Sequence, residues 1–229
     1  GAYVNRHCYN ETSTITLHCL SKYFENTIPG ITELITEATF PEKELSIYQQ
    51  NQLQRLSLNL KKGDFVATRL IDAYLFGEKH PYGKYSTEAT FKALEIEELK
   101  KFYNQYYTNG KCIIFAAGKF PANFETLLNK HIGGLSLSKS NLEVPQHQIV
   151  PATKKQYQLV NDAQSVQGSI RIARPFHNRK HPDFAGTQVL NTLFGGFFGS
   201  RLMSNIREDK GFTYGIHSYL QNHIDTSAW

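Results

Sequence analysis

The sequence has few cysteines, no long apolar run and no block of basic residues. Its three cysteines, Cys8, Cys19 and Cys112, are too few and too scattered for a disulfide framework, and none belongs to a C-x-x-C pair. No apolar stretch approaches the length of a membrane span. Basic residues cluster only as isolated pairs, so the formal net charge of +5 indicates a solvated surface and not a nucleic-acid footprint. We therefore expect a soluble protein without membrane insertion or nucleic-acid binding.

The composition is otherwise that of a globular protein. Of the 229 residues, 40% are apolar, 13% are aromatic and 20% are charged, which is enough for one large or two small hydrophobic cores. The first residues already have the pattern of a structured segment, and the sequence ends at Trp229 without a polar tail. We expect a piece of a longer protein, whose compartment, cytoplasmic or periplasmic, the sequence leaves open.

Hydrophobic periodicity divides the chain into two similar halves. Residues 133–152 have no periodicity and contain prolines and serines, which is typical of an interdomain linker. Predicted strands and helices alternate on both sides of this linker. This pattern favours an α+β fold with two similar domains, each a mostly antiparallel sheet with helices packed on one face. We predict a first domain at 1–134, a linker at 135–152 and a second domain at 153–229.

The apolar spacing also predicts the individual elements. The expected strands are 12–20, 111–118, 156–160, 166–173 and 212–220. The expected helices are 21–38, 42–60, 65–76, 86–89, 94–107, 122–131, one from residue 183 and one around residues 202–206. Asp64 is expected to cap the third of these helices, and the near-continuous apolar run 111–118 predicts a strand that is buried on both faces.

The stretch 189–219 carries the strongest chemical pattern. Its periodicity predicts a helix, a glycine break, a second short helix that ends at Gly211, and a strand. Arg207 therefore lies near a helix end, and Tyr214 enters the next strand seven residues later. A guanidinium and a phenol that converge across such a turn can both donate hydrogen bonds to one carbonyl or oxyanion. On spacing alone, helix capping by Arg207 and sheet packing by Tyr214 are the better interpretation.

Five motifs occur in a recognisable order along almost the whole chain. They are FPEKEL (40–45), LFGEKHPYG (75–83), AAGKF (116–120), HPD (181–183) and LFGGFFGSRLMSNIREDKGFTYG (193–215). Together they resemble the pitrilysin/insulinase family of inverted-motif zinc peptidases. The resemblance implies subunits of two similar α+β domains, paired by fusion or association, that close around unfolded peptides.

The family holds Zn²⁺ with the two histidines of an H-x-x-E-H helix and a glutamate from a later helix. No H-x-x-E-H occurs in this sequence, and the resemblance places it upstream of Gly1. The third ligand is expected on the helix after FPEKEL, yet residues 46–60 contain no carboxylate, and Tyr48 and Arg55 stand at about the expected positions. A cation there would repel the metal. We expect no metal site in this chain, and zinc in a partner subunit or in a segment outside it.

The resemblance reverses the interpretation of Arg207 and Tyr214. They match the family's pattern I-R-x-x-x-G-x-x-Y, in which an Arg and a Tyr from the zinc-less half hold the substrate carbonyl near the partner's metal. The sequence therefore favours a substrate-binding, non-zinc subunit or half of a zinc metalloendopeptidase, with this pair as substrate clamp and oxyanion stabiliser in trans. Two alternatives stay open: a catalytic zinc peptidase whose H-x-x-E-H lies outside the sequence, and a non-enzymatic scaffold or peptide-binding homologue.

Three further motifs have a structural interpretation. His177 and His181 have the spacing of a helical ligand pair, but Pro182 follows directly and no Glu lies between them. His80-Pro81-Tyr82-Gly83 is explained by a tight turn that is anchored by aromatic rings. The glycines of 195–199 follow a helix and lack the Lys-Ser/Thr of a phosphate loop, so they indicate close backbone packing.

Overall fold

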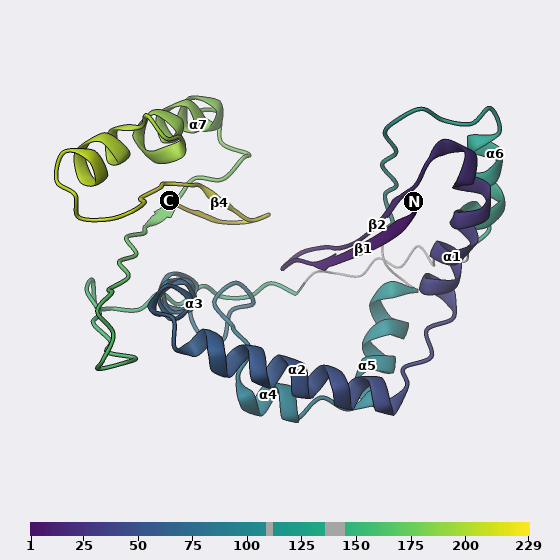
Figure 1. Ribbon diagram of the computed structural model, residues 1–229, viewed down its shortest axis with the longest axis horizontal. Helices are drawn as coiled ribbons and strands as arrows, with labels where there is room; N and C mark the ends of the chain where they lie inside the picture. Colours follow the sequence, from purple (N-terminus) through teal and green to yellow (C-terminus); the bar gives the residue numbers. More distant parts are fainter. Residues whose placement is uncertain (109–111, 136–144) are drawn as a thin grey trace. The chain divides into compact units, whose positions relative to one another are not determined.

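The computed structural model describes residues 1–108, 112–135 and 145–229, which form two compact units. The first unit comprises Gly1–Asn59 and Ser86–Gln146, and the second comprises Leu60–Tyr85 and His147–Trp229. Helices and short antiparallel strands occur in both (Figure 1), so the predicted α+β class is confirmed. Residues 136–144 of the predicted linker lie outside the described residues. The predicted domain boundaries stay a prediction.

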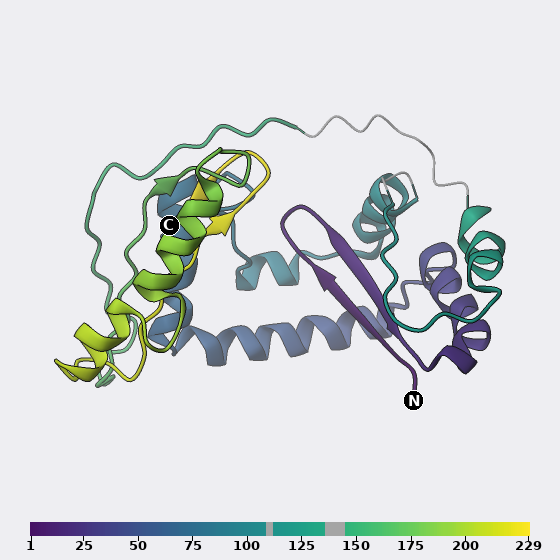
Figure 2. The ribbon, with the colours of Figure 1, turned by 90° about the horizontal axis from the view of Figure 1, so that it is seen from above.

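The first unit begins with an antiparallel hairpin. Strands β1 (Tyr3–Cys8) and β2 (Ser13–His18) pair from Tyr3 opposite His18 to Cys8 opposite Ser13 (Figure 2). Helix α1 (Phe24–Thr36) follows a 3₁₀ turn, η1 (Ser21–Tyr23), and packs on α6 (Phe124–Leu128), which continues into the π-helical turn η3 (Asn129–Gly133). Ile28 and Ile31 of α1 and Leu127 of α6 are buried.

Helix α2 (Glu42–Leu60) starts directly after Pro41, as predicted. The side-chain amide of Gln49 on α2 donates hydrogen bonds of 3.0 Å to the carbonyl oxygens of Phe91 and Leu94. These bonds fix α4 (Glu88–Lys92) beside α2. Helix α5 (Ile96–Phe102) and the π-helical turn η2 (Tyr103–Tyr107) complete the first unit.

The second unit combines helix α3 (Gly63–Phe76) with a small sheet of strand order β3-β5-β4. The strands are β3 (Pro175–Phe176), β4 (Gln221–Asn222) and β5 (Ser227–Ala228), and the further helical elements are α7 (Phe184–Asn191), η4 (Thr192–Gly196) and η5 (Met203–Glu208). Its core gathers Leu75, Phe76 and Ala228, so the end of α3 packs against the central strand of the sheet.

Four of the predicted strands are not formed. Among the described residues, 112–118, 156–160, 166–173 and 212–220 pair with no neighbouring strand. The run 112–118 is also not buried, since the Phe115 side chain is 90% exposed. A β-strand forms only where a second strand pairs with its backbone. The alternation of apolar and polar side chains indicates a preference for the extended conformation but does not show whether a partner strand is present. The prediction of a strand buried on both faces was therefore wrong for the described part of this run.

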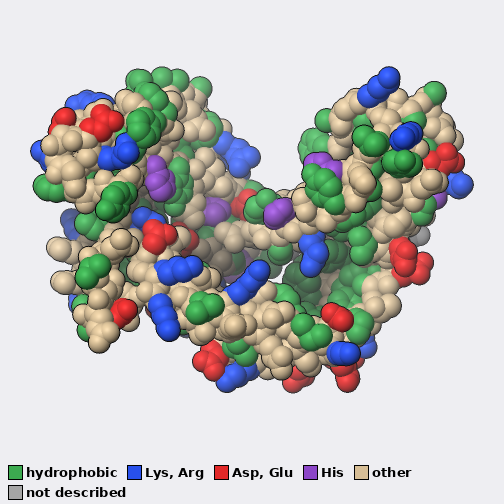
Figure 3. Space-filling view, viewed as in Figure 1, with side chains coloured by type: hydrophobic (Ala, Val, Ile, Leu, Met, Phe, Trp, Pro, Cys, Tyr) green, Lys and Arg blue, Asp and Glu red, His purple; other side chains and the backbone are tan. Residues whose placement is uncertain are grey.

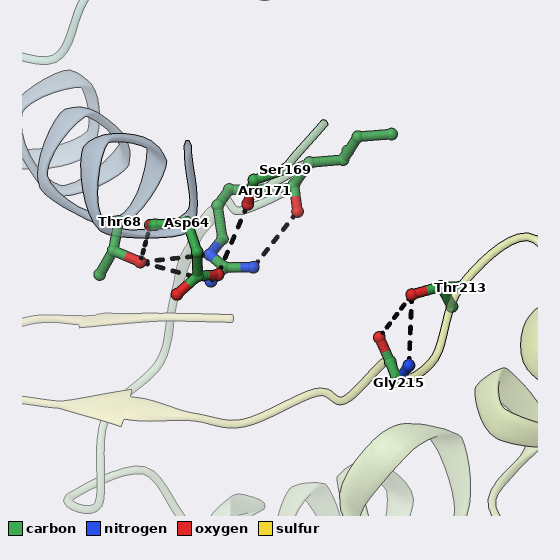
Figure 4. A network of polar contacts seen from close by, with 7 residues as sticks. Asp64, Thr68, Ser169, Arg171, Thr213 and Gly215 are labelled. Atoms are coloured by element: carbon green, nitrogen blue, oxygen red, sulfur yellow. Dashed lines mark hydrogen bonds and ion pairs between the residues drawn. The ribbon is translucent and has the colours of Figure 1, made fainter. Parts of the chain in front are cut away.

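The capping prediction for Asp64 was also wrong. Lys62 takes the cap position of α3, and Asp64 lies in the first turn. There its carboxylate accepts from the guanidinium of Arg171, which also donates to the hydroxyl of Thr68 at 3.4 Å (Figure 4). Asp64 thus anchors the segment around Arg171 to the start of α3.

Candidate functional site

The candidate pair lies on a continuous stretch of the second unit, between η4 and β4. Residues 201–208 form helical turns, and η5 ends at Glu208. The turn after it is closed by two hydrogen bonds, from the Gly211 N–H to the Arg207 carbonyl and from the Phe212 N–H to the Ile206 carbonyl, both 3.1 Å. Gly211 has a φ of +61°, a left-handed conformation that glycine adopts without a steric penalty. The predicted C-terminal glycine is confirmed.

Arg207 occupies the last turn of η5, where a helix carries partial negative charge. Its side chain is half-buried, and its guanidinium carbon lies 4.7 Å from the centre of the Phe198 ring. A ring face attracts a cation, so Phe198 restricts the orientations of the guanidinium. Within the described part of the chain Arg207 forms no ion pair. Its hydrogen-bond donors are available to an external acceptor.

Tyr214 is 95% exposed and lies on the segment 212–220. Its neighbours fix the backbone locally: the Thr213 hydroxyl donates to the Gly215 carbonyl at 2.9 Å and accepts the Gly215 N–H at 3.2 Å (Figure 4). Among the residues that the structure describes, no hydrogen bond or ring contact joins Tyr214 to Arg207. The pair shares one stretch of the second unit, and its joint role stays a prediction.

The helix that precedes the pair presents an unusual distribution of side chains. The apolar residues Val189 and Leu190 of α7, and Leu193 of the following η4, are more than half exposed, and Figure 3 shows hydrophobic side chains on the surface over α7. Its buried residues are instead the polar Thr187 and Asn191. Both are hydrogen-bonded, Thr187 to the His177 ring at 2.7 Å and Asn191 to the segment after Tyr214. Polar contacts therefore attach α7 to the rest of its unit.

Asn191 is a further residue of this region, and the motifs in the sequence do not identify it. In the structure it lies 8% exposed between Ser218 and Trp229, which both donate to its side-chain oxygen, at 2.7 and 2.9 Å. The sequence offers one weak signal for it: an asparagine between the apolar pairs Val189-Leu190 and Leu193-Phe194. Its partners are 27 and 38 positions away, and no local pattern identifies them.

The residues of α2 do not fit a zinc site. Tyr48 and Arg55 line a shallow surface hollow together with Asn51, Gln52, Gln54 and Leu58, all from this helix. None of these side chains is a histidine, cysteine or carboxylate, which are the ligands that zinc takes in proteins. In the described residues as a whole, no group of three or more such side chains could hold a metal ion.

The histidine motifs have the structural roles that we inferred. The rings of His177 and His181 stack with centres 4.2 Å apart, and His181 accepts the Asp183 N–H at 3.2 Å. His80 is buried in its tight turn, where it accepts the Tyr82 N–H at 3.1 Å. Burial, and to a smaller extent the nearby His147, lower the pKa of His80, so the turn favours the neutral ring.

No helix in the described ranges is long and apolar enough to cross a bilayer.

Comparison with known proteins gives a consistent family. Residues 93–229 match the family described as "Peptidase M16 inactive domain". An "Uncharacterized zinc protease YmxG" of Bacillus subtilis is 22% identical over 99% of the chain and 54% of its own length. A "Non-peptidase homolog YmxG" of Helicobacter pylori is 24% identical over 90% of the chain and 49% of its own length. The chain thus spans about half the length of these relatives.

Two solved structures share the fold. A crystal structure of a peptidase M16 inactive domain from Pseudomonas fluorescens has a TM-score of 0.71 at 20% identity, and it covers 99% of this chain and 55% of its own. The crystal structure of a protease from Helicobacter pylori has a TM-score of 0.72 at 15% identity, and the match covers 100% of this chain and 56% of that protein. The arrangement of helices and strands therefore belongs to a known architecture.

Proposed function

The chain belongs to the family of peptidase M16 inactive domains, and from this premise we propose that it is a substrate-binding, non-zinc subunit or half of an inverted-motif zinc metalloendopeptidase. In this proposal a homologous subunit or half carries the Zn²⁺. The chain supplies Arg207 and Tyr214 to the partner's active site, where an unfolded peptide is hydrolysed.

The observation that carries the proposal is the availability of both side chains. Arg207 forms no ion pair in the described part of the chain, and Tyr214 is 95% exposed on a segment that no described strand covers. A protein that serves only as a scaffold has no use for an unpaired guanidinium and an exposed phenol at this spacing. Both groups donate hydrogen bonds and are suited to the same oxygen acceptor.

The chemistry follows from where charge develops during peptide hydrolysis. When water adds to the scissile carbonyl carbon, the carbonyl oxygen gains negative charge. The Arg207 guanidinium and the Tyr214 hydroxyl would donate to that oxygen, and charge strengthens these hydrogen bonds in the transition state relative to the ground state. Removing one donor of this kind lowers the rate by about 10²–10³-fold.

The substrate is proposed to bind in extended form. Segment 212–220 has no strand partner among the described residues, and the N–H groups of Phe212, Gly215 and Ser218 already have acceptors within the unit, so the proposal assigns peptide pairing to the other backbone groups of the segment, beside Tyr214. Such strand addition recognises main-chain groups and demands an unfolded peptide. It leaves the sequence preference to the side-chain contacts.

A non-enzymatic role is the second candidate, and one observation favours it: the Helicobacter pylori relative is named a non-peptidase homologue. The two candidates differ in what Arg207 does. A scaffold keeps its assembly function without the guanidinium, whereas a donor in trans loses turnover.

The test uses the full-length protein, co-purified with its zinc-bearing partner, and a quenched fluorescent peptide. We expect Arg207→Ala and Tyr214→Phe each to lower kcat by about 10²–10³-fold, with the complex intact by size-exclusion chromatography. Arg201→Ala removes a charge from the same helical stretch, and Tyr219→Phe removes a hydroxyl from the same segment; both should retain activity. Full turnover by Arg207→Ala would refute the proposal and support the scaffold role.

A further inference from the structure

Three segments of the second unit meet at Gly195, the fourth residue of η4. A Cβ atom at this position would lie 2.7 Å from both the Cβ and the backbone nitrogen of Ser218, and 2.8 Å from Cδ1 of Leu202. Real Cβ atoms essentially never approach so closely. The Ser218 N–H also donates to the Gly195 carbonyl at 2.9 Å. Glycine is needed here because the backbones touch.

A polar cluster holds the same place from the side of α7. The Ser218 hydroxyl and the Trp229 indole N–H both donate to the Asn191 side-chain oxygen, and the indole N–H also lies 2.6 Å from the Ser218 hydroxyl. The Asn191 amide nitrogen donates to the Ser218 carbonyl at 3.3 Å. We call Asn191, Gly195, Ser218 and Trp229 the Gly195 junction.

The position of the junction in the chain links it to the candidate pair. Leu202 lies in the first helical turn, and Arg207 follows five residues later. Ser218 comes four residues after Tyr214 on the segment that carries the phenol. The closed turn at Gly211 joins these two arms at their far end. The stretch from Leu202 to Ser218 is thus held at both ends, with Arg207 and Tyr214 between the two fixed points.

We propose that Gly195 and Asn191 are positioning residues, which set how far the Arg207 guanidinium lies from the Tyr214 phenol. The inference rests on the proposed function, because it assigns a purpose to this spacing. A methyl group at position 195 must displace the backbone of Ser218, whose nitrogen would lie 2.7 Å away, whereas the tip of the Leu202 side chain can rotate aside. The displacement of Ser218 moves the arm that carries Tyr214 relative to the one that carries Arg207. A misplacement of about 1 Å in an active site costs about 10²-fold in rate.

The experiment compares Gly195→Ala with Gly186→Ala. Gly186 lies in α7, and a Cβ there meets nothing within 4 Å, so it is a matched control for the added methyl group. The first readout is hydrogen exchange of the Ser218 amide in the full-length protein. We expect at least 10-fold faster exchange in Gly195→Ala and an unchanged rate in Gly186→Ala.

The second readout is turnover with the co-purified zinc-bearing partner. We expect Gly195→Ala to lower kcat by about 10–10²-fold, since the Tyr214 phenol moves relative to the Arg207 guanidinium. Combined with Arg207→Ala, it should add no further loss, because the spacing no longer matters once the guanidinium is gone. Ser218→Ala, which removes the hydroxyl but keeps the close packing, should give a smaller loss of the same kind and serves if Gly195→Ala does not fold.

The outcomes separate this inference from the proposed function. Full activity of Arg207→Ala overturns the proposed function, and the positioning role with it. A large loss in Arg207→Ala with full activity in folded Gly195→Ala, or in Ser218→Ala in its place, overturns only the positioning role. A loss that adds to that of Arg207→Ala also overturns it, because the junction would then act through other residues.

Discussion

The carboxylate of Asp72 is partly buried and hydrogen-bonded within the second unit. It lies on α3, where the side-chain amide of Gln221 from β4 donates to it at 3.2 Å. Burial raises the pKa of Asp72 above its usual value of 3.8, and the hydrogen bond from Gln221 acts in the opposite direction with a smaller effect. Desolvation of the charged form therefore exceeds the gain from the hydrogen bond.

The raised pKa predicts how stability depends on pH. The folded protein binds this proton more tightly than the unfolded chain, so the free energy of unfolding falls as pH rises from 3.8 through the raised value. We expect Asp72→Asn to keep the acceptor for Gln221, to remove this pH dependence and to equal or exceed the wild type in stability at neutral pH. Urea denaturation of both proteins, below pH 3.8 and above the raised pKa, measures the free energy of unfolding at each pH.

The control for this measurement is Asp209→Asn, which makes the same change at an exposed carboxylate of the same unit. A clear loss of stability in Asp72→Asn at neutral pH would mean that the charge itself is stabilising. Burial would then not be the dominant influence on Asp72.

The residue scale is also where the sequence was least informative. Of Gly195, Gly196 and Gly199, which were expected to permit close packing, Gly195 packs closely against another segment, and the sequence did not identify Ser218 and Leu202 as its neighbours. Asn191 was missed because its partners come from distant segments. Arg207 and Tyr214 were selected through the motif around them, and their exposure was not predictable from it.

At the scale of elements, the contact between Arg171 and the start of α3 can be tested directly. The Arg171 side chain is 28% exposed, and that of Asp64 is 73% exposed, so water screens much of their attraction. Exposed ion pairs contribute about 0.2–1 kcal/mol. We expect Arg171→Ala to lower the free energy of unfolding by about 1 kcal/mol, including its lost hydrogen bond to Thr68.

A double-mutant cycle with Asp64→Asn isolates the pair from the effect of Asp64 on the helix dipole. The expected coupling is a few tenths of a kcal/mol to about 1 kcal/mol. Arg179→Ala, which removes an exposed arginine of the same unit, is the matched control and should change stability little. Zero coupling in the cycle would show that the segment around Arg171 is held by other contacts.

The elements themselves were predicted unevenly, for a physical reason. Helices α1, α2 and α3 were found within a few residues, because their hydrogen bonds are local and their apolar spacing is regular. Of the hairpin β1–β2, the second strand was predicted, as residues 12–20, and the first was not. Strands that depend on distant partners, such as the expected 156–160 and 166–173, were wrong since alternation does not reveal a partner.

At the scale of the whole molecule, the question is which chain holds the metal. The chain covers about half the length of its curated relatives, so the measurement requires the full-length protein. Helix α2 has no carboxylate from Ser46 onward, and Arg55 brings a positive charge to the hollow on its surface. A cation beside a would-be ligand position opposes metal binding.

We therefore expect the isolated full-length protein to contain no stoichiometric zinc and to leave a quenched peptide intact. Its mixture with the zinc-bearing partner should contain about one zinc per pair and cleave the peptide, and a chelator should abolish the cleavage. The chelator should lower the Tm of the partner and leave the Tm of this chain unchanged, because only a protein that binds the metal is stabilised by it. Stoichiometric zinc and turnover in the isolated protein would instead identify a catalytic subunit, whose H-x-x-E-H lies outside the present chain and whose third ligand comes from somewhere other than α2.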